Sequence, residues 1–535
     1  MIRNYFIIAL RNFWRHKVFS IINILGLAIG ISASLVIYLI VQYEFSYEKW
    51  QPDGERIYRV VTNMHFPEMD FKNGGVPGPL PNAVRAEIPG IEESSAFYTG
   101  RVETTTIPVN GTDGKKFKRQ PEVVFADNHY FNLFKYKWLA GSPNTALADP
   151  NKVVLTESRA KVYWPGVAPV NTIGQTIIYD DSVKAIVTGI VKDLDEATHF
   201  NFKEFISLST FIESLKTNSG YDEWGSVGSS SQFFLKFTNT PDVRKIDKQL
   251  AAIRKKYAKG NEYLATDHFL QPMYDMHFNQ DFDVFDQRQA HMPTLLGLLA
   301  VAAFLLLLGC INFINLTTAQ ASQRAKEIGI RKTMGSSKGH LIVQFLSETL
   351  LLTLAATILS IILTPWILNI FSDFVPDGLH FEISRRPDII IFIVLLLVGV
   401  SLLSGFYPAL VLTKYKPVTV LKNVAFTNTG TSRRVWIRKT LTVSQFVIAQ
   451  FFIIATMVVG KQIRFSLNKD MGFRKEAIIN FDAPLNYQKP DNKQFVLLDK
   501  LKKIPGIQEI SLADEPPASN SLNVSTMKIK KDGKE

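Results

Sequence analysis

The sequence predicts an α+β membrane protein in which a bundle of five transmembrane helices carries a large mixed α+β domain. Five apolar runs are each long enough to cross a bilayer as a helix, which takes roughly 20 residues. The segment between the first and second runs is polar and mixes strand and helix patterns, as α+β domains do. Segments rich in Lys and Arg flank the runs on one side of the membrane. The runs are 18–43, 293–320, 341–371, 389–413 and 441–460.

The formal net charge of +12 is explained by membrane topology. Lys and Arg are concentrated in short segments between the apolar runs, as the positive-inside rule requires of cytoplasmic loops. We therefore expect the lipid bilayer, and no nucleic acid, as a partner. The single cysteine, Cys310, lies within an apolar run, so neither a disulfide framework nor a cysteine-based metal site is expected.

The chain begins with a basic segment, 1–17, whose apolar residues recur at helical spacing. We expect either an amphipathic helix in the cytoplasmic interface or an ordinary anchor, and both place the N-terminus in the cytoplasm. The apolar run 18–43 is longer than the core of a cleaved signal peptide, so it is a retained transmembrane helix. Gly26, Gly30 and Ser34 are spaced by four, and such a stripe of small residues lets another helix approach closely.

Residues 44–292 are expected to form the outer domain, whose roughly 250 residues suffice for one or two domains. Runs with strand character alternate there with helical patterns. The predicted strands are 56–62, 122–126, 152–155, 176–179, 184–190 and 232–237, and the predicted helices are 80–86, 157–163 and 243–259.

No catalytic constellation is found in the outer domain. Its histidines are not paired at a spacing of four, and neither an HExxH nor a GxSxG string occurs. An acidic group could hold Ca²⁺, but the EF-hand spacing is missing, so hydrogen bonding in turns is the favoured role. Three aromatic residues could line a ligand surface, although a place in the core is favoured. The acidic group is Asp180, Asp181, Asp193, Asp195 and Glu196, and the aromatic residues are Phe211, Tyr221 and Trp224.

A short basic loop, 324–340, separates the second and third apolar runs. Its excess of positive charge places it in the cytoplasm. The loop is either a solvated connector whose charges only fix the orientation, or a docking segment for a partner. Its charged residues are Arg324, Lys326, Glu327, Arg331, Lys332 and Lys338.

The order of residues in this loop favours docking. The string RAKEIGIRKTMG, followed by a long apolar helix, resembles the transmission segment of the MacB/FtsX family of ABC transporter permeases. In that family a short helix docks on a cytoplasmic ATPase. Ile330 and Met334 are four apart, so they could form an apolar knob on one helical face, with charged residues around it. The residues expected to couple to the ATPase are Arg324, Glu327, Ile328, Gly329, Ile330, Arg331, Met334 and Gly335.

The resemblance covers nearly the whole chain. Residues 293–420 resemble an FtsX-like permease domain, and 44–292 resemble a MacB-like periplasmic core domain with a second subdomain inserted at about 130–226. The string SGFYPALVLTKYKPVTVL resembles the family's exit from the fourth span, where proline removes backbone donors and stops or kinks the helix. The residues that mark this exit are Tyr407, Pro408 and Pro417.

Glu348 is a charged residue near the start of the third apolar run. A carboxylate one or two turns into the membrane is costly to leave unpaired. We therefore expect Glu348 to reach a cation of the loop or a backbone cap rather than lipid.

A second copy of the opening of the chain follows the fourth run. The basic linker 421–440 and the fifth run repeat the N-terminal arrangement, and IPGIQEIS at Ile504 repeats IPGIEESS at Ile88. Residues 461–535 resemble the start of a second periplasmic domain. Parallel repeats are a common transporter plan. We expect the second membrane half to come from a further C-terminal region or from a second copy of the chain.

The sequence contains no GxxxxGK[ST] phosphate loop, so we expect this chain to bind no cofactor and a separate partner to hold ATP and Mg²⁺. The resemblance implies a non-enzymatic permease subunit that couples ATP hydrolysis by a cytoplasmic ABC ATPase dimer to movement of the periplasmic domain, for export or efflux. This process is called mechanotransmission.

The same resemblance implies a multi-pass protein of the cytoplasmic (inner) membrane with a cytoplasmic N-terminus. A periplasmic adaptor or an outer-membrane component is a further candidate partner. The alternatives are a membrane-anchored sensor or scaffold and an FtsX-like activator of cell-wall hydrolases. The substrate, whether peptide, antibiotic or lipoprotein, is left open.

Overall fold

The computed structural model describes residues 17–66, 70–109, 112–215, 221–258, 265–376, 386–414, 431–472, 477–481 and 492–513, with a few isolated residues beside them. Within these ranges the side chains of 109, 112–113, 214–215, 265, 321–326, 431–435 and 437–438 are not described. Four of the predicted features lie wholly or partly outside the described residues. They are the interfacial helix 1–17, Pro417, the linker 421–440 and the second domain start, 461–535.

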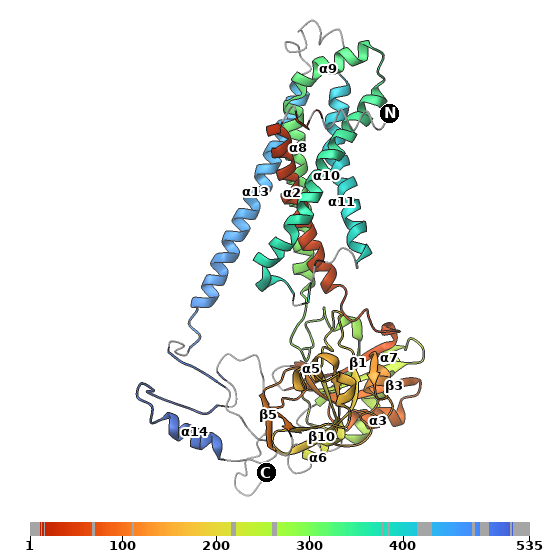
Figure 1. Ribbon diagram of the computed structural model, residues 1–535, viewed down its shortest axis with the longest axis vertical. Helices are drawn as coiled ribbons and strands as arrows, with labels where there is room; N and C mark the ends of the chain where they lie inside the picture. The colour runs from red at the N-terminus through yellow and green to blue at the C-terminus, as the bar shows by residue number, and fades with distance from the viewer. Residues whose placement is uncertain are drawn as a thin grey trace.

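Five long apolar helices are found in the described part of the chain, which confirms the predicted number of membrane spans. Figure 1 shows four of them side by side in one bundle, from which the fifth, α13, diverges toward the sheet-rich end of the molecule. The five helices are α2 Lys17–Glu44, α8 Met292–Ala319, α10 Lys338–Ile370, α11 Pro387–Thr413 and α13 Thr431–Asn468.

The centre of the bundle is an apolar cluster to which four helices contribute. Leu27 and Ile31 of α2 meet Phe313 of α8, Ala356 of α10 and Val400 of α11. In a bilayer such packing is not driven by escape from water, so close van der Waals contact between the helices stabilises it.

Helix α13 is attached to the bundle through α8. The rings of Phe304 and Phe452 meet edge to face at 5.4 Å, and the Asn315 amide donates to the Thr442 hydroxyl at 3.4 Å. Most of the other described apolar side chains of α13 are exposed. These side chains suit contact with lipid or with further helices.

The segment between α2 and α8 folds into a sheet-rich domain, which we call the sheet domain. Its described residues form a mixed sheet of thirteen strands in the order β13-β1-β12-β3-β6-β11-β8-β10-β9-β4-β5, with β2 beside β1 and β7 beside β10. Only the β6/β11 and β8/β10 pairs among these are parallel. The strands are β1 Ile57–His65, β2 Asp70–Asn73, β3 Ile91–Tyr98, β4 Thr104–Val109, β5 Thr112–Lys118, β6 Val123–Ala126, β7 Trp138–Ala140, β8 Lys152–Thr156, β9 Thr176–Tyr179, β10 Val183–Val191, β11 Glu204–Ser207, β12 Ser231–Phe237 and β13 Ala265–Pro272.

Short helices pack on the sheet. Two of them begin where the sequence provides a cap: the Thr156 hydroxyl accepts the Arg159 N–H at the start of α5, and the Asp242 carboxylate accepts the Lys245 N–H at the start of α7. The described helical elements outside the spans are α3 Leu80–Glu87, α4 Tyr130–Leu133, α5 Glu157–Tyr163, α6 Leu208–Leu215, α7 Val243–Tyr257, α9 Ala321–Thr333, α14 Lys493–Leu501 and the 3-10 turns η1 Gly54–Arg56, η2 Pro169–Thr172, η3 Met273–Asp275 and η4 Ser372–Phe374.

The predicted strands coincide with β1, β6, β8, β9, β10 and β12, and the predicted helices with α3, α5 and α7, so these predictions are confirmed. The strands β2, β3, β4, β5, β7, β11 and β13 are not among the predicted elements. The inserted subdomain at 130–226 stays a prediction. The strands form one continuous sheet, so the sheet itself marks no boundary between subdomains.

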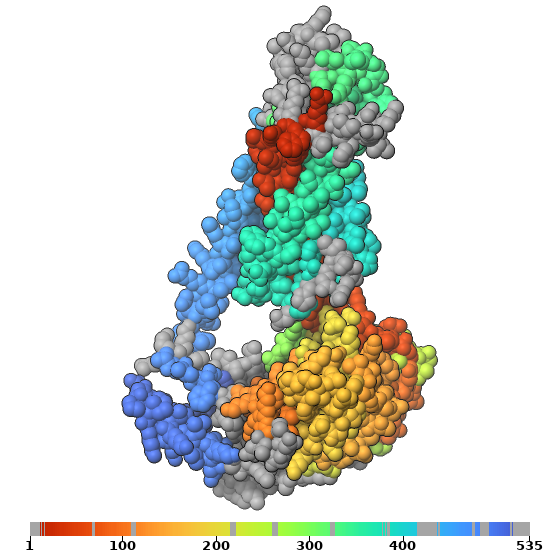
Figure 2. Space-filling model, viewed as in Figure 1, coloured from red at the N-terminus to blue at the C-terminus, as the bar shows by residue number. Residues whose placement is uncertain are grey.

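The aromatic residues considered for a ligand surface pack against the core of the sheet domain. Phe211 stacks on Tyr98 with ring centroids 4.2 Å apart, and Trp224 stacks on Tyr257 at 5.5 Å. In the acidic group, Asp180 lies in the turn between β9 and β10 and accepts the backbone N–H groups of Glu103 and Thr104 at 2.9 Å, which ties this turn to the start of β4. Figure 2 shows the sheet domain as a compact body beneath the helices.

Candidate coupling site between the second and third spans

The loop between α8 and α10 forms the helix α9, Ala321–Thr333, at the end of the bundle far from the sheet domain (Figure 1). The helix ends in a Schellman motif, in which the Ser336 N–H donates to the Arg331 carbonyl at 3.0 Å. This motif places Gly335 at a φ of 93°, a conformation that suits glycine. The hydroxyl of Ser337 then caps the start of α10. The short turn sets the direction of α9 relative to α10.

The inward face of α9 is fixed to two membrane helices by one apolar side chain. Ile328 is 3% exposed and packs with Leu341 and Phe345 at the start of α10 and with Ala409 and Leu412 near the end of α11. Such a cluster ties α9 to both spans, so a displacement of α9 must displace their ends.

One further contact holds the same side of α9, where Gly329 is buried next to Ile328. The Lys332 ammonium donates to the carbonyl of Thr413, the last residue of α11, at 2.6 Å. A cation at a helix C-terminus is favourable because the unpaired carbonyls there carry partial negative charge.

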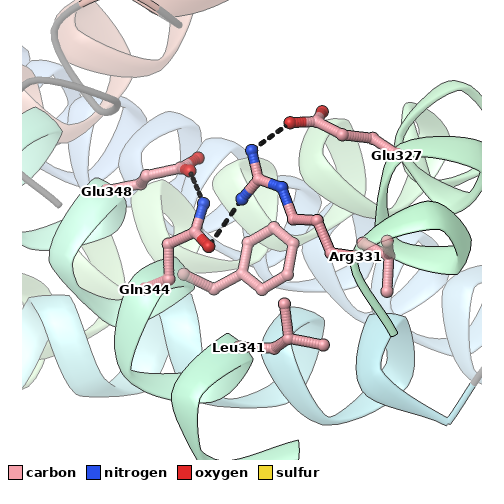
Figure 3. A pocket seen from close by; sticks show the side chains of 7 residues that line it. Glu327, Arg331, Leu341, Gln344 and Glu348 are labelled. Atoms are coloured by element: carbon pink, nitrogen blue, oxygen red, sulfur yellow. Dashed lines mark hydrogen bonds and ion pairs between the residues drawn. The ribbon is translucent and has the colours of Figure 1, made fainter. Parts of the chain in front are cut away.

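A polar chain runs from α9 into α10 and is drawn in Figure 3. Arg331 forms an ion pair with Glu327 and donates to the Gln344 side-chain oxygen at 2.6 Å. The Gln344 amide nitrogen in turn donates to the Glu348 carboxylate at 3.2 Å. The four side chains line a small pocket together with Ile328, Leu341 and Phe345.

The amide of Gln344 can play both roles because it has an acceptor oxygen and a donor nitrogen. Its oxygen faces the guanidinium of Arg331 and its nitrogen faces the carboxylate of Glu348, which is 8% exposed. Glu348 is thus linked to a cation of the loop, Arg331, through the bridging amide of Gln344. Gln344 is absent from the residues expected from sequence, although its spacing of four from Glu348 could have identified it.

Replacing Glu348 with leucine is expected to loosen α9, because the Gln344 amide then loses its acceptor. A hydrogen bond to a charged group contributes about 1.5–3 kcal/mol, so amide exchange across α9 should accelerate about tenfold or more. Hydrogen–deuterium exchange of the full chain measures this rate. Glu348→Gln keeps an acceptor oxygen at the same position and serves as the control. Equal exchange of α9 in the leucine variant and the wild type would exclude a fixing role for Glu348.

The outward face of α9 is partly apolar. Ile330 is 44% exposed and Met334 is 81% exposed, while the carboxylate of Glu327 also lies at the surface. Large apolar side chains at such exposure next to charged ones are typical of a site that binds another protein. Arg324 lies in the first half of α9, where side chains are not described.

The stripe of small residues on α2 lies against α8. A side chain at Gly30 would come within 3.0 Å of the Leu305 carbonyl oxygen, and one at Gly26 within 3.3 Å of the Asn312 amide. The Ser34 hydroxyl donates to the Ala302 carbonyl at 3.1 Å. Close approach of the two helix backbones therefore depends on this stripe.

The residues expected at the exit of the fourth span lie within α11. Tyr407 is half-buried and Pro408 is buried, and the helix continues past them to Thr413. The structure therefore brings Glu327, Ile328 and Arg331 together with Glu348 around one pocket. Ile330 and Met334 lie on the outward face, and the α2 stripe and the α11 exit residues belong to separate contacts.

Comparisons with known proteins match two segments of the chain to family models. Residues 20–253 match the MacB-like periplasmic core domain, and residues 299–417 match the FtsX-like permease C-terminal domain. The chain is 22% identical over 376 residues to the uncharacterized ABC transporter permease YknZ of Bacillus subtilis (strain 168), which covers 66% of this chain and 83% of YknZ.

A second relative is the macrolide export ATP-binding/permease protein MacB of Chromobacterium violaceum. It is 24% identical over 265 residues, which are 49% of this chain and 37% of that protein. The match thus spans little more than a third of this relative. Among solved structures, a permease domain from Porphyromonas gingivalis is 16% identical and covers 47% of this chain and 98% of the domain, with a TM-score of 0.36.

Proposed function

Because this chain belongs to the MacB/FtsX-type ABC transporter permease family, we propose that it is a permease subunit that transmits ATP-driven movement of a separate ATPase to its sheet domain. The observation that carries this proposal is that α9 has an exposed apolar face and an opposite face that is packed on membrane helices. Its outward face presents Ile330 and Met334, and its inward face is fixed to α10 and α11. A partner that binds the outward face and changes conformation would therefore move two membrane helices.

The contacts between the spans provide a path for such movement. The Ser360 hydroxyl of α10 donates to the Ala28 carbonyl of α2 at 3.0 Å, and Ala356 packs beside Leu27 in the central cluster. Helix α2 runs directly into the sheet domain at Glu44. Tightly packed interiors shift as units rather than deform continuously, so a displacement at α9 would reach the sheet domain.

The proposed partner is a cytoplasmic ABC ATPase dimer, which would hold ATP and Mg²⁺. The basic residues around α9 support a cytoplasmic position of this end. The proposal therefore includes a periplasmic sheet domain, a cytoplasmic N-terminus and a location in the inner membrane. The cargo class stays open between export of a substrate and activation of an outer partner. An adaptor or outer-membrane component would bind on the sheet-domain side.

An ATPase dimer has two docking grooves, whereas the described residues contain one helix of the α9 type. We propose that the second groove is filled either by a further C-terminal region of the natural protein or by a second copy of the chain. Helix α13 repeats the sequence character of α2 and, within the described residues, packs on the bundle through α8. It would form the first span of the second membrane half.

Co-purification tests the proposal. The full-length chain, produced together with a candidate ABC ATPase, is expected to retain that ATPase in detergent and to change its rate of ATP turnover. A chain that binds no ATPase and leaves turnover unchanged would support a membrane-anchored sensor or scaffold instead.

Labelling from outside the cell is expected to separate the two ends of the molecule. A cysteine at Ser226, which is exposed in the sheet domain, should react with a membrane-impermeant thiol reagent in cells whose outer membrane is permeabilised. A cysteine at Ser336, after α9, should react only after the inner membrane is opened. The reverse pattern would overturn the orientation. The native Cys310 is buried within a span, so its background is expected to be low.

A further inference from the structure

A buried polar cluster joins the sheet domain to the first and second spans. Glu44 is the last residue of α2, His277 and Asp286 belong to the segment that leads into α8, and His199 precedes β11. The two described segments that connect the sheet domain to these spans therefore meet at this cluster. None of these residues is part of the α9 site.

The cluster forms a continuous chain of hydrogen bonds. A carboxylate oxygen of Asp286 lies 2.8 Å from His199 Nδ1, and His199 Nε2 lies 3.3 Å from His277 Nδ1. His277 Nε2 lies 2.6 Å from a carboxylate oxygen of Glu44. Both imidazoles are almost fully buried. The ring of Tyr47 stacks on His277 with centroids 3.6 Å apart and planes 7° apart, which holds the imidazole in place.

The three contacts determine how many protons the histidine pair carries. Each contact needs one proton between its two atoms, so with Asp286 and Glu44 ionised the four ring nitrogens hold three protons. Two neutral imidazoles hold only two. The pair therefore carries one additional proton and one positive charge, which lies between the carboxylates of Asp286 and Glu44.

The surrounding charges fit a single additional proton. Arg288 donates to the second oxygen of Glu44 at 2.8 Å and lies over the rings of Tyr43 and Tyr47. Glu48 accepts the backbone N–H of His199 at 2.7 Å and the Thr198 hydroxyl at 2.9 Å, and burial raises the pKa of its carboxyl group.

Burial, and secondarily the charge of His199 and Arg288, outweigh the Glu44 contact and lower the pKa of His277. A second additional proton on the pair is therefore disfavoured.

We propose that Glu44, His199, His277 and Asp286 form a clamp with one shared proton, which fixes the sheet domain on the first and second spans and loosens when that proton leaves. With the proton present, all three contacts have a donor and an acceptor. After its loss, one contact must place two lone pairs opposite each other, and the negative charge of the carboxylates is no longer balanced. The consequence for transmission rests on the proposed function, whereas the clamp itself does not.

Distance measurements between spin labels test the clamp. Labels at Ser226 in the sheet domain and at Phe374 beyond α10 are introduced into full-length protein that carries Cys310→Ser. Pulsed electron paramagnetic resonance in lipid vesicles then gives the distribution of distances between the two labels. It is measured from about pH 6 to about pH 8.5, a range that covers the usual titration of imidazoles. We expect a narrow distribution at the lower pH that broadens as the pH rises.

His277→Phe keeps an aromatic ring against Tyr47 but removes both ring nitrogens, so its distribution should be broad at every pH. The matched control is His129→Phe, because His129 also contacts a carboxylate, that of Glu93 at 2.8 Å, but lies at the surface of the sheet domain. It should keep the pH response of the wild type.

Hydrogen–deuterium exchange of the sheet domain shows whether the His277 variant is folded. The pH response of the wild type tests the clamp without that variant. A wild-type distribution that does not change with pH would overturn the clamp. So would a well-folded His277→Phe protein with the wild-type response. These measurements need no ATPase, so failure of the clamp is distinct from failure of the proposed transmission.

Discussion

Replacing Met334 with glutamate is expected to abolish stable association with the ATPase. Met334 is 81% exposed at the end of α9, so its substitution should leave the fold of the chain intact. In the complex the new carboxylate would be buried against an apolar surface without a partner. Loss of a central interface residue costs about 2–4 kcal/mol, which weakens binding roughly 30-fold to 1,000-fold. Co-purification and the concentration dependence of ATPase stimulation measure the effect.

The control is Phe374→Glu, because Phe374 is also 81% exposed but lies at the opposite end of α10, in η4. It should bind the ATPase as the wild type does. If Met334→Glu bound equally well, the outward face of α9 would not be the docking surface.

Replacing Ile328 with alanine is expected to separate ATPase binding from its consequence. The outward residues Ile330 and Met334 remain, so the ATPase should still bind. The cluster that joins α9 to α10 and α11 loses a fully buried side chain, which typically costs about 2–5 kcal/mol. ATP turnover should then continue at a rate that no longer responds to the state of the sheet domain.

Ile358→Ala is the matched control, because Ile358 is the same residue type on α10 but is 53% exposed. It should behave as the wild type in both binding and turnover. Unchanged coupling in the Ile328 variant would show that movement enters the membrane helices by another contact.

The spans and the end of α9 could be predicted because their causes are local in sequence. Long apolar runs are sufficient to specify membrane helices, and Gly335 ends α9 through a conformation that glycine adopts easily. Strand β3 was harder to predict, because it buries Ser94 and Ser95 among its apolar residues and so lacks a regular alternation. Its pairing partners β12 and β6 determine its conformation.

The contacts that define the two polar networks depend on tertiary structure. Gln344 and Arg331 belong to different helices and meet only because the turn after α9 folds one onto the other. His199 and His277 are 78 positions apart, and His277 and Glu44 are 233 apart. No short sequence pattern connects such residues. A search for closely spaced histidines therefore could not find the clamp.

The most direct test of transmission is whether ATP moves the sheet domain. With spin labels at Ser226 and Phe374, the complex with the ATPase is measured with and without a non-hydrolysable ATP analogue and Mg²⁺. Transmission through α9 predicts a shift of the label distance on nucleotide binding in the wild type and none in Ile328→Ala, although both bind the ATPase. An unchanged distance in an actively hydrolysing wild-type complex, or the same shift in the Ile328 variant, would contradict it.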